Sequence, residues 1–280
     1  MPITAEGVTY TYMKGSPFEK DALKNVSLEI KDGEFLAIIG HTGSGKSTLV
    51  QHFNGLIKPS SGKVCINGID TRGKELKELR RHVGMVFQYP EHQLFEETVY
   101  KDIAFGLEKQ GFTESEIEMR VREAVSIVGI ESSILDKSPF ELSGGQKRRV
   151  AIAGVVAMKP SILILDEPTA GLDPQGRDEV FQFISRMHRQ LNITIILVSH
   201  SMEDVARLAQ RIIVMSDGKI QMQGSAGEIF KDAVELEKIG LSAPQITHLM
   251  KKLKTVVPYL NDNIFTVQEA KREILKYLKK

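Results

Sequence analysis

The string Gly40-His41-Thr42-Gly43-Ser44-Gly45-Lys46-Ser47 constrains the fold of this 280-residue chain more than any other feature. It follows an apolar run at residues 35–39, which is typical of a strand buried on both faces of a parallel sheet, and it precedes a helical segment that begins near Ser47. Glycines in such a turn allow consecutive backbone N–H groups to point at one anion, and the following helix N-terminus favours negative charge. The string therefore predicts a phosphate-binding loop, with a glycine-rich turn that binds nothing as the alternative.

A second apolar run, at residues 162–165, ends in the carboxylates of Asp166 and Glu167. A charge pair at the end of a buried strand costs desolvation energy unless a metal or a water network receives it. Taken alone, such a strand end is commonly an ordinary surface turn. Next to a phosphate loop, it predicts that Asp166 and the hydroxyl of Ser47 hold Mg²⁺, that Glu167 polarises an attacking water, and that Lys46 contacts the phosphates of ATP.

The segment Leu142-Ser143-Gly144-Gly145-Gln146 precedes a helix-compatible run at residues 147–158. A serine hydroxyl, glycine N–H groups and a helix N-terminus together suit a second anion. One chain needs only one cradle for a γ-phosphate. The second cradle is therefore expected to serve the nucleotide of another chain.

With these three motifs the sequence resembles the ABC ATPase family, in which two subunits sandwich two ATP molecules between the P-loop of one and the signature of the other. The resemblance implies that Gln88 reaches the metal and the attacking water, that His200 contacts the γ-phosphate, and that Asp173 lies in a loop crossing the dimer interface. Tyr12 would stack on adenine, although Tyr10 lies on the same face of that strand. The implied ATP-binding residues are Tyr12, Gly40, His41, Thr42, Gly43, Ser44, Gly45, Lys46, Ser47 and Thr48; the catalytic ones are Glu167, His200 and Gln88; the magnesium ligands are Ser47, Gln88 and Asp166; and the signature is Leu142, Ser143, Gly144, Gly145 and Gln146.

Longer strings at residues 15–19, 41–48, 51–56, 87–95 and 148–154 are similar to the ATPases of energy-coupling factor transporters, and most similar to the second of two paralogues. This resemblance implies a subunit whose ATP-driven dimer closure powers uptake of vitamins or of cobalt and nickel. Its implied partners are a second ATPase, either a paralogue or a second copy, a transmembrane coupling subunit and a separate substrate-binding membrane subunit. Alternatives are the ATPase of another ABC transporter class, a soluble ABC ATPase acting on nucleic acid or ribosomes, and a regulatory nucleotide-binding module without turnover.

Further apolar runs at residues 9–13, 26–30, 83–87, 193–198 and 212–215 predict strands, and helical patterns separate most of them. We expect an α/β fold: a P-loop NTPase (RecA-like) core with N-terminal antiparallel β elements, an inserted helical signature subdomain and a small C-terminal helical appendage. The expected domains are an ABC ATPase domain at residues 1–228, with the helical subdomain at about 89–159, and a C-terminal helical dimerisation region at 229–280. Thr266 and Glu269 predict a capping box at the last helix.

The composition mainly excludes classes of function and structure. The net charge of +1 gives no field that favours nucleic acid, and the single cysteine, Cys65, forms no internal disulfide and fits a reducing compartment as a small buried strand residue. No apolar run approaches the roughly 18 residues of a spanning helix. A peripheral position on the cytoplasmic face of the cell membrane is therefore expected, with no nucleic-acid partner.

An acidic loop follows Gln88. Glu91, Glu96 and Glu97 surround the apolar Leu94 and Phe95, a combination suited to an apolar helix that carries an arginine. In the transporter family that the sequence resembles, this surface docks the transmembrane subunit. The alternative is an exposed acidic loop with two core residues.

Overall fold

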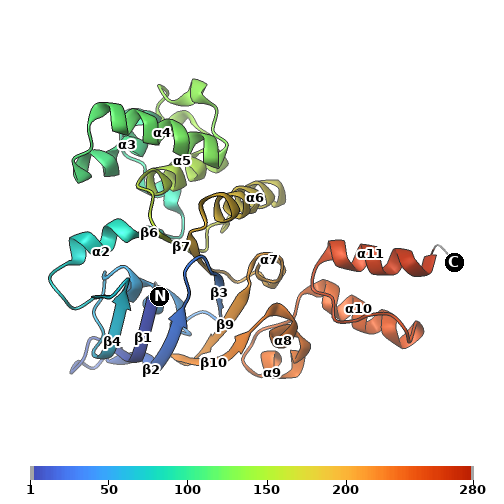
Figure 1. Cartoon of the computed structure of the whole chain (residues 1–280). Coiled ribbons are helices and arrows are strands. Elements are labelled where there is room, and N and C mark those ends of the chain that lie inside the picture. Colours follow the sequence, from blue (N-terminus) through green and yellow to red (C-terminus); the bar gives the residue numbers. More distant parts are fainter. Residues whose placement is uncertain (1–2, 279–280) are drawn as a thin grey trace.

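The computed structural model describes residues 3–278. The outer ends of the two predicted domains, residues 1–2 and 279–280, lie outside the described residues. The chain builds two sheets, a helical group on one side of them and a pair of C-terminal helices that projects from the body (Figure 1). The predicted fold class is confirmed. Between residues 3 and 278, no helix combines the length and the apolar character needed to cross a membrane.

The central sheet has six strands in the order β10-β9-β3-β8-β7-β6. Their bounds are β3 Phe35–Ile39, β6 Val83–Val86, β7 Ile162–Asp166, β8 Thr194–Val198, β9 Arg211–Ser216 and β10 Lys219–Gly224. β3, β7 and β8 are buried at every residue, as their apolar runs predict. β10 was not predicted, because it is an antiparallel edge strand without a buried face and so lacks an apolar run.

The parallel register decides where the functional residues meet. Val86 of β6 pairs with Leu165 of β7, Asp166 pairs with Val198 of β8, and Val198 pairs with Ile38 of β3. The carboxyl ends of these four strands therefore lie side by side at one edge of the sheet. The loops that leave this edge carry the P-loop, Gln88, Glu167 and His200.

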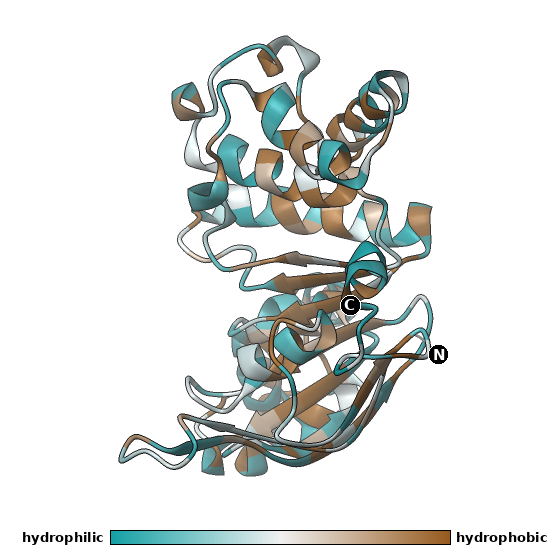
Figure 2. Ribbon diagram, turned by 90° about the vertical axis from the view of Figure 1, so that its left-hand side faces the viewer, coloured by the Kyte–Doolittle hydropathy of each residue, from teal (hydrophilic) through white to brown (hydrophobic). Residues whose placement is uncertain are grey.

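A smaller antiparallel sheet covers one face of the core, in the order β2-β1-β4-β5. Its strands are β1 Ile3–Tyr12, β2 Lys20–Ile30, β4 Ser61–Ile66 and β5 Ile69–Asp70, and α1 (Lys46–Phe53) and α2 (Leu76–His82) lie beside it. One apolar cluster joins both sheets to α1 through side chains such as Val8, Ile38 and Phe53. Figure 2 shows that many residues of the strands are hydrophobic. Cys65 of β4 lies in a strand as predicted, but its side chain is half-buried and not fully buried.

The helical group consists of α3 Val99–Gln110, α4 Glu114–Val128 and α5 Gly144–Ala157, with the short 3-10 turns η1 Pro90–Gln93, η2 Ser132–Ile134 and η3 Pro139–Glu141. Helices α6 (Pro174–Leu191) and α7 (Met202–Leu208) follow β7 and β8. The group shares a core with β7, β8 and α6. As predicted, residues 89–159 contain no strand; all of them are described.

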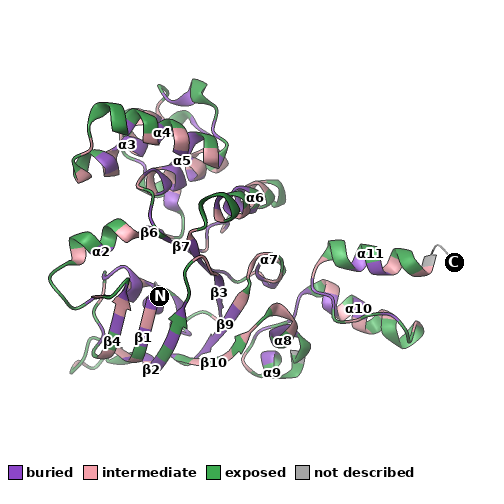
Figure 3. Cartoon of the chain, in the orientation of Figure 1, coloured by how far each residue is buried: buried purple, intermediate pink, exposed green. Residues whose placement is uncertain are grey.

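The C-terminal helices divide into two pairs. Helices α8 (Ala226–Lys231) and α9 (Ala233–Lys238) are anchored to the main core, where Ile229 and Phe230 share a cluster with Ile39. Helices α10 (Gln245–Val256) and α11 (Val267–Leu278) have their own small cluster around Met250. The predicted capping box forms, because Glu269 accepts the backbone N–H of Thr266 and donates its own to the threonine hydroxyl. Figure 3 shows how much of the surface of α10 and α11 is exposed.

Candidate active site

The predicted phosphate loop leaves β3 and enters α1 directly. Gly40 has φ of 157° and Gly45 has φ of 102°, conformations that favour glycine. A Cβ on Gly40 would lie 2.3 Å from the carbonyl oxygen of Met215, and one on Gly45 would lie 2.5 Å from that of Ala22. Both positions therefore require glycine for conformation and for space.

Lys46 is buried at the start of α1 and points back into the loop. Its Nζ donates to the carbonyl oxygens of Gly40 at 2.7 Å and His41 at 3.0 Å. Burial lowers the pKa of Lys46, while the carboxylates of Glu167 and Asp166 oppose that shift. The ammonium group thus lies inside the curl of the loop, where a phosphate would meet both it and the backbone N–H groups.

Asp166 and Ser47 are brought together in the fold, although they lie far apart in the sequence. The Ser47 hydroxyl hydrogen-bonds the Asp166 carboxyl group, and burial raises the pKa of that carboxyl. A hydroxyl and a carboxylate are the hard oxygen ligands that Mg²⁺ prefers. These residues fit the predicted metal.

Glu167 follows β7 with φ of 51°, a strained conformation for a non-glycine residue. Nε2 of His200 lies 3.1 Å from its Oε1, but this buried oxygen receives no well-directed hydrogen bond. Burial, followed by the negative charge of Asp166, raises the pKa of Glu167 to about 7. A carboxyl group with a pKa near neutrality and an unpaired oxygen suits a general base that accepts a proton from water.

His200 follows β8 and is half exposed, with 50% of its side chain accessible. Burial of the remainder, together with the charge of Lys46, lowers the pKa of His200. The neutral ring is therefore favoured even within the ordinary titration range of histidine, and it can hydrogen-bond a phosphate or a water.

Tyr12 lies at the end of β1 beside the P-loop. Its hydroxyl lies 3.1 Å from Oγ1 of Thr48, and its ring meets that of Tyr10 edge-on. A cavity of about 210 Å³ is lined by Tyr12, Lys20, Ala22, Gly43, Gly45, Lys46, Ser47 and Thr48. Tyr12, rather than Tyr10, borders the space next to the phosphate loop. Lys20 had no signal in the sequence, because only its pairing with Tyr12 across the sheet brings it there.

The remaining predicted residues lie outside this cavity. Gln88 is exposed two residues after β6, at the sheet edge where Asp166 ends β7. Asp173 caps α6 by accepting the N–H of Gly176 at 2.8 Å. The structure thus places Gln88 at the same edge as the carboxylates and Asp173 at an exposed helix start.

The predicted signature residues lie together at the start of α5. Ser143 caps α5, with its hydroxyl accepting the N–H of Gln146 while the Gln146 side chain accepts that of Ser143. Space is open around Gly144 and Gly145, where a Cβ would meet nothing within 4 Å. Leu142 is buried and anchors the segment. None of these residues lines the cavity beside the P-loop.

The acidic loop differs from its prediction in one residue. Glu91 is held by Arg148 of the same chain, with distances of 2.6 and 3.0 Å between guanidinium nitrogens and carboxylate oxygens. Glu97 pairs with Lys101 on the surface at 2.7 Å. Glu91 is therefore not a free acceptor for an arginine from another subunit, and that hypothesis was wrong for this residue.

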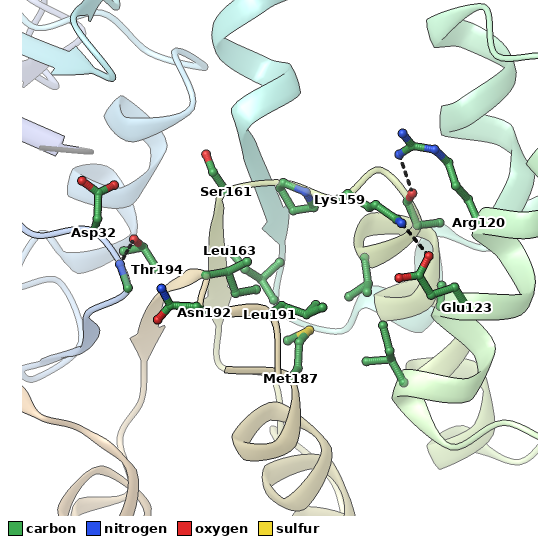
Figure 4. Close-up of a pocket in the computed structure, with 17 residues that line it drawn as sticks. Asp32, Arg120, Glu123, Lys159, Ser161, Leu163, Met187, Leu191, Asn192 and Thr194 are labelled. Carbon is green, nitrogen blue, oxygen red and sulfur yellow. Dashed lines mark hydrogen bonds and ion pairs between the residues drawn. The ribbon is translucent and has the colours of Figure 1, made fainter. Parts of the chain in front are cut away.

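An apolar cavity of about 380 Å³ lies at the opposite edge of the sheet (Figure 4). Leu163, Met187 and Leu191 line it, and the Lys159–Glu123 ion pair, at 2.5 Å, lies on its helical side. Ser161 and Thr194, at the amino ends of β7 and β8, also border it. Because the length of β7 separates this cavity from Asp166, it is not part of the nucleotide site.

The fold and the site define a P-loop ATPase with an inserted helical subdomain, on which the signature segment begins α5. Residues 23–170 match the family model described as ABC transporter. The chain is 61% identical to the energy-coupling factor transporter ATP-binding protein EcfA2 of Acetivibrio thermocellus, over the full length of both, and 58% identical to that of Clostridium tetani, covering 99% of this chain and 97% of that one. The chain belongs to the ABC transporter family, among the ATP-binding proteins of energy-coupling factor transporters.

Solved structures agree with this membership. CbiO1 from Clostridium perfringens, described as part of the ABC transporter complex cbiONQ, matches with a TM-score of 0.76 and 43% identity over 89% of this chain and 98% of that one. A dimeric ATP-binding cassette in a post-hydrolysis state, bound to ADP and Pi, matches with a TM-score of 0.71 and 32% identity over 80% of this chain and 98% of that one. The protein is an ABC ATPase, an enzyme that couples ATP hydrolysis to transport.

The raised pKa of Glu167 predicts a pH-dependent stability. The ordinary pKa is 4.5 and the folded one is about 7, so ionisation destabilises the fold increasingly between these values and fully above pH 7. In the nucleotide-free chain, Glu167→Gln should raise the free energy of unfolding by about 2 kcal/mol at pH 8 and by less than half of that near pH 5. Denaturant unfolding with a chelator, at both pH values, measures this. An equal effect at the two pH values would contradict the raised pKa.

Proposed function

We propose that this chain is one of two ATPase subunits that close face to face around ATP and that closure powers uptake through a transmembrane coupling subunit. A separate substrate-binding membrane subunit would select the cargo, a vitamin or cobalt or nickel. The chain would lie on the cytoplasmic face of the cell membrane, without a nucleic-acid partner. The observation that carries this proposal is the pair of separate glycine-containing helix starts, one at α1 and one at α5, each suited to an anion.

Each residue of the site has a proposed task. The P-loop N–H groups and the ammonium of Lys46 would bind the phosphates, and Tyr12 would stack on the base. Glu167 would orient the attacking water through its unpaired Oε1 and accept its proton, while His200 and Gln88 would position that water. Ser47 and Asp166, with Gln88, would hold Mg²⁺, which would neutralise charge that develops on the phosphates.

The signature would complete the site of the other subunit. Ser143 and Gly144 are exposed at a helix start, Gly145 is half-buried, and the space around both glycines is open, so the place suits a γ-phosphate presented from outside. Asp173, exposed at the start of α6, would lie at the same interface. A one-chain site would leave this second cradle without a ligand.

The C-terminal region is proposed to strengthen the pairing. Leu249 and Val256 are seven residues apart on α10, and both are exposed, as are Tyr259, Val267 and Leu275. Large apolar side chains that gather on one small unit are typical of an interaction surface. We infer that residues 229–280 contribute to dimerisation, chiefly through α10 and α11.

Purification from membranes tests the transporter proposal. A tagged chain extracted in mild detergent should copurify with a second ATPase and with at least two integral membrane proteins, and mass spectrometry would identify them. A matched sample of the chain with Leu249, Val256 and Tyr259 changed to serine should recover less of the ATPase partner. Recovery of ribosomes or nucleic acid in place of membrane proteins would overturn the proposal.

A further inference from the structure

Arg148 lies one turn into α5 and is almost completely buried, with 1% of the residue exposed. An arginine stays protonated in a protein, so a buried guanidinium requires partners for its N–H groups. The proposed roles of the signature and of the catalytic residues do not use this side chain. The groups that hydrogen-bond the Arg148 guanidinium therefore show which segments this buried charge connects.

Two sets of contacts satisfy the guanidinium. Nε and Nη2 donate to the two carboxylate oxygens of Glu91 at 3.0 and 2.6 Å, a bidentate pair. Nη1 donates to the carbonyl oxygens of Pro168 at 3.2 Å and Ala170 at 2.8 Å. Burial alone would raise the pKa of Glu91, but the hydrogen bonds and the charge of Arg148 hold it below its ordinary value. Glu91 is therefore ionised at neutral pH.

These contacts join three segments that carry different parts of the site. Glu91 belongs to η1, which begins two residues after Gln88. Pro168 and Ala170 belong to the turn that follows Glu167, and Arg148 itself belongs to the helix that Ser143 caps. One guanidinium thus connects the loop after Gln88, the turn after Glu167 and the signature helix.

The turn at Glu167 needs such support. Its backbone has φ of 51°, and a strained conformation persists only where its surroundings hold it. Its own N–H donates to Val198 O at 3.0 Å, and its carbonyl accepts the N–H of Ala170 at 3.1 Å. Arg148 adds two hydrogen bonds to the turn immediately after the strained residue.

We propose that Arg148 is a positioning residue, which ties the turn carrying Glu167 to η1 and to α5 so that the three segments move as one unit. Glu91 keeps 16% of its side chain exposed, so the connection runs from the surface of η1 to the catalytic turn. A partner that displaces η1 would thereby displace Glu167. This inference rests on the proposed role of Glu167 as the base in hydrolysis.

The next residue on α5 provides a matched control. Arg149 pairs with Glu179 of α6 at 2.5 Å, and these side chains are 21% and 43% exposed. This pair also joins α5 to another segment by an arginine and a glutamate. It does not contact the Glu167 turn in any hydrogen bond of the described residues.

The test measures ATP hydrolysis by the full-length chain paired with its ATPase partner. In Glu91→Gln, an amide N–H₂ faces guanidinium donors, so the turnover number should fall by about tenfold while KM for ATP stays within about twofold. Arg148→Met should lose more, and Arg148→Lys should restore part of the loss because the charge returns without the fork. Glu179→Gln should hydrolyse ATP as the wild type does.

Two results would overturn the inference. One is a Glu91→Gln variant that binds and hydrolyses ATP like the wild type, and the other is equal losses in Glu91→Gln and Glu179→Gln. If Arg148→Met fails to fold, Glu91→Gln decides the question, with its folded state checked by ATP affinity and thermal midpoint. Failure of the proposed function is separate: Glu167→Gln would then hydrolyse ATP at the wild-type rate, whatever the Arg148 variants do.

Discussion

Glu167→Gln is expected to reduce the turnover number for ATP by about 100-fold or more while ATP still binds. The substitution keeps the size of the side chain and its hydrogen-bonding capacity but removes the group that accepts the proton from water. General bases typically contribute about 10²–10⁴ in rate. The raised pKa of about 7 is what makes this carboxyl group effective near neutral pH.

The measurement is steady-state phosphate release together with an equilibrium titration of ATP binding. A closed, ATP-bound dimer should accumulate, which size-exclusion chromatography detects as a nucleotide-dependent shift. Lys46→Ala is the contrasting variant: it removes a charge from the phosphate loop and should weaken binding itself. Wild-type turnover in Glu167→Gln, or equal ATP affinity in Lys46→Ala, would contradict the assigned roles.

Ser143→Arg should abolish hydrolysis at the site of the partner subunit, again by about 100-fold or more, while this chain keeps its own ATP affinity. The hydroxyl and the open space around Gly144 and Gly145 would be replaced by a bulky cation at the place proposed for the partner's γ-phosphate. Loss of a single donor at such a cradle commonly costs about 10²–10³ in rate. ATP titration of the isolated chain and hydrolysis by the assembled pair measure the two effects separately.

Ser225 supplies the control for this variant. It also caps a helix, α8, with the same reciprocal bonding to a side chain three residues later, Glu228. Ser225→Arg and Ser143→Arg should therefore lose similar capping energy, about 1 kcal/mol, but only the latter should stop hydrolysis. If Ser143→Arg abolished ATP binding by the isolated chain, the signature would belong to the chain's own site and the sandwich would be wrong.

Local patterns in the sequence determined most of the fold. The continuous apolar runs predict β3, β7 and β8 because strands buried on both faces need apolar residues at every position. β10 was not predicted, since a partly exposed edge strand has no continuous apolar run. The helix start at Thr266 was predicted because capping depends on residues only three positions apart, whereas α5 begins at Gly144, three residues before the predicted run at 147–158.

The sequence by itself determined which residues carry the chemistry: the glycines and Lys46 of the P-loop, the Asp166–Glu167 strand end and the signature, since each is a contiguous string with its own physical requirement. Only the tertiary structure decided which distant groups pair. Arg148 holds Glu91 across 57 residues, and this bond occupies the carboxylate that the sequence analysis offered to an arginine of another subunit. Pairing at that distance depends on how α5 and η1 pack against the sheet, and charge alone makes Glu91, Glu96 and Glu97 indistinguishable along the chain.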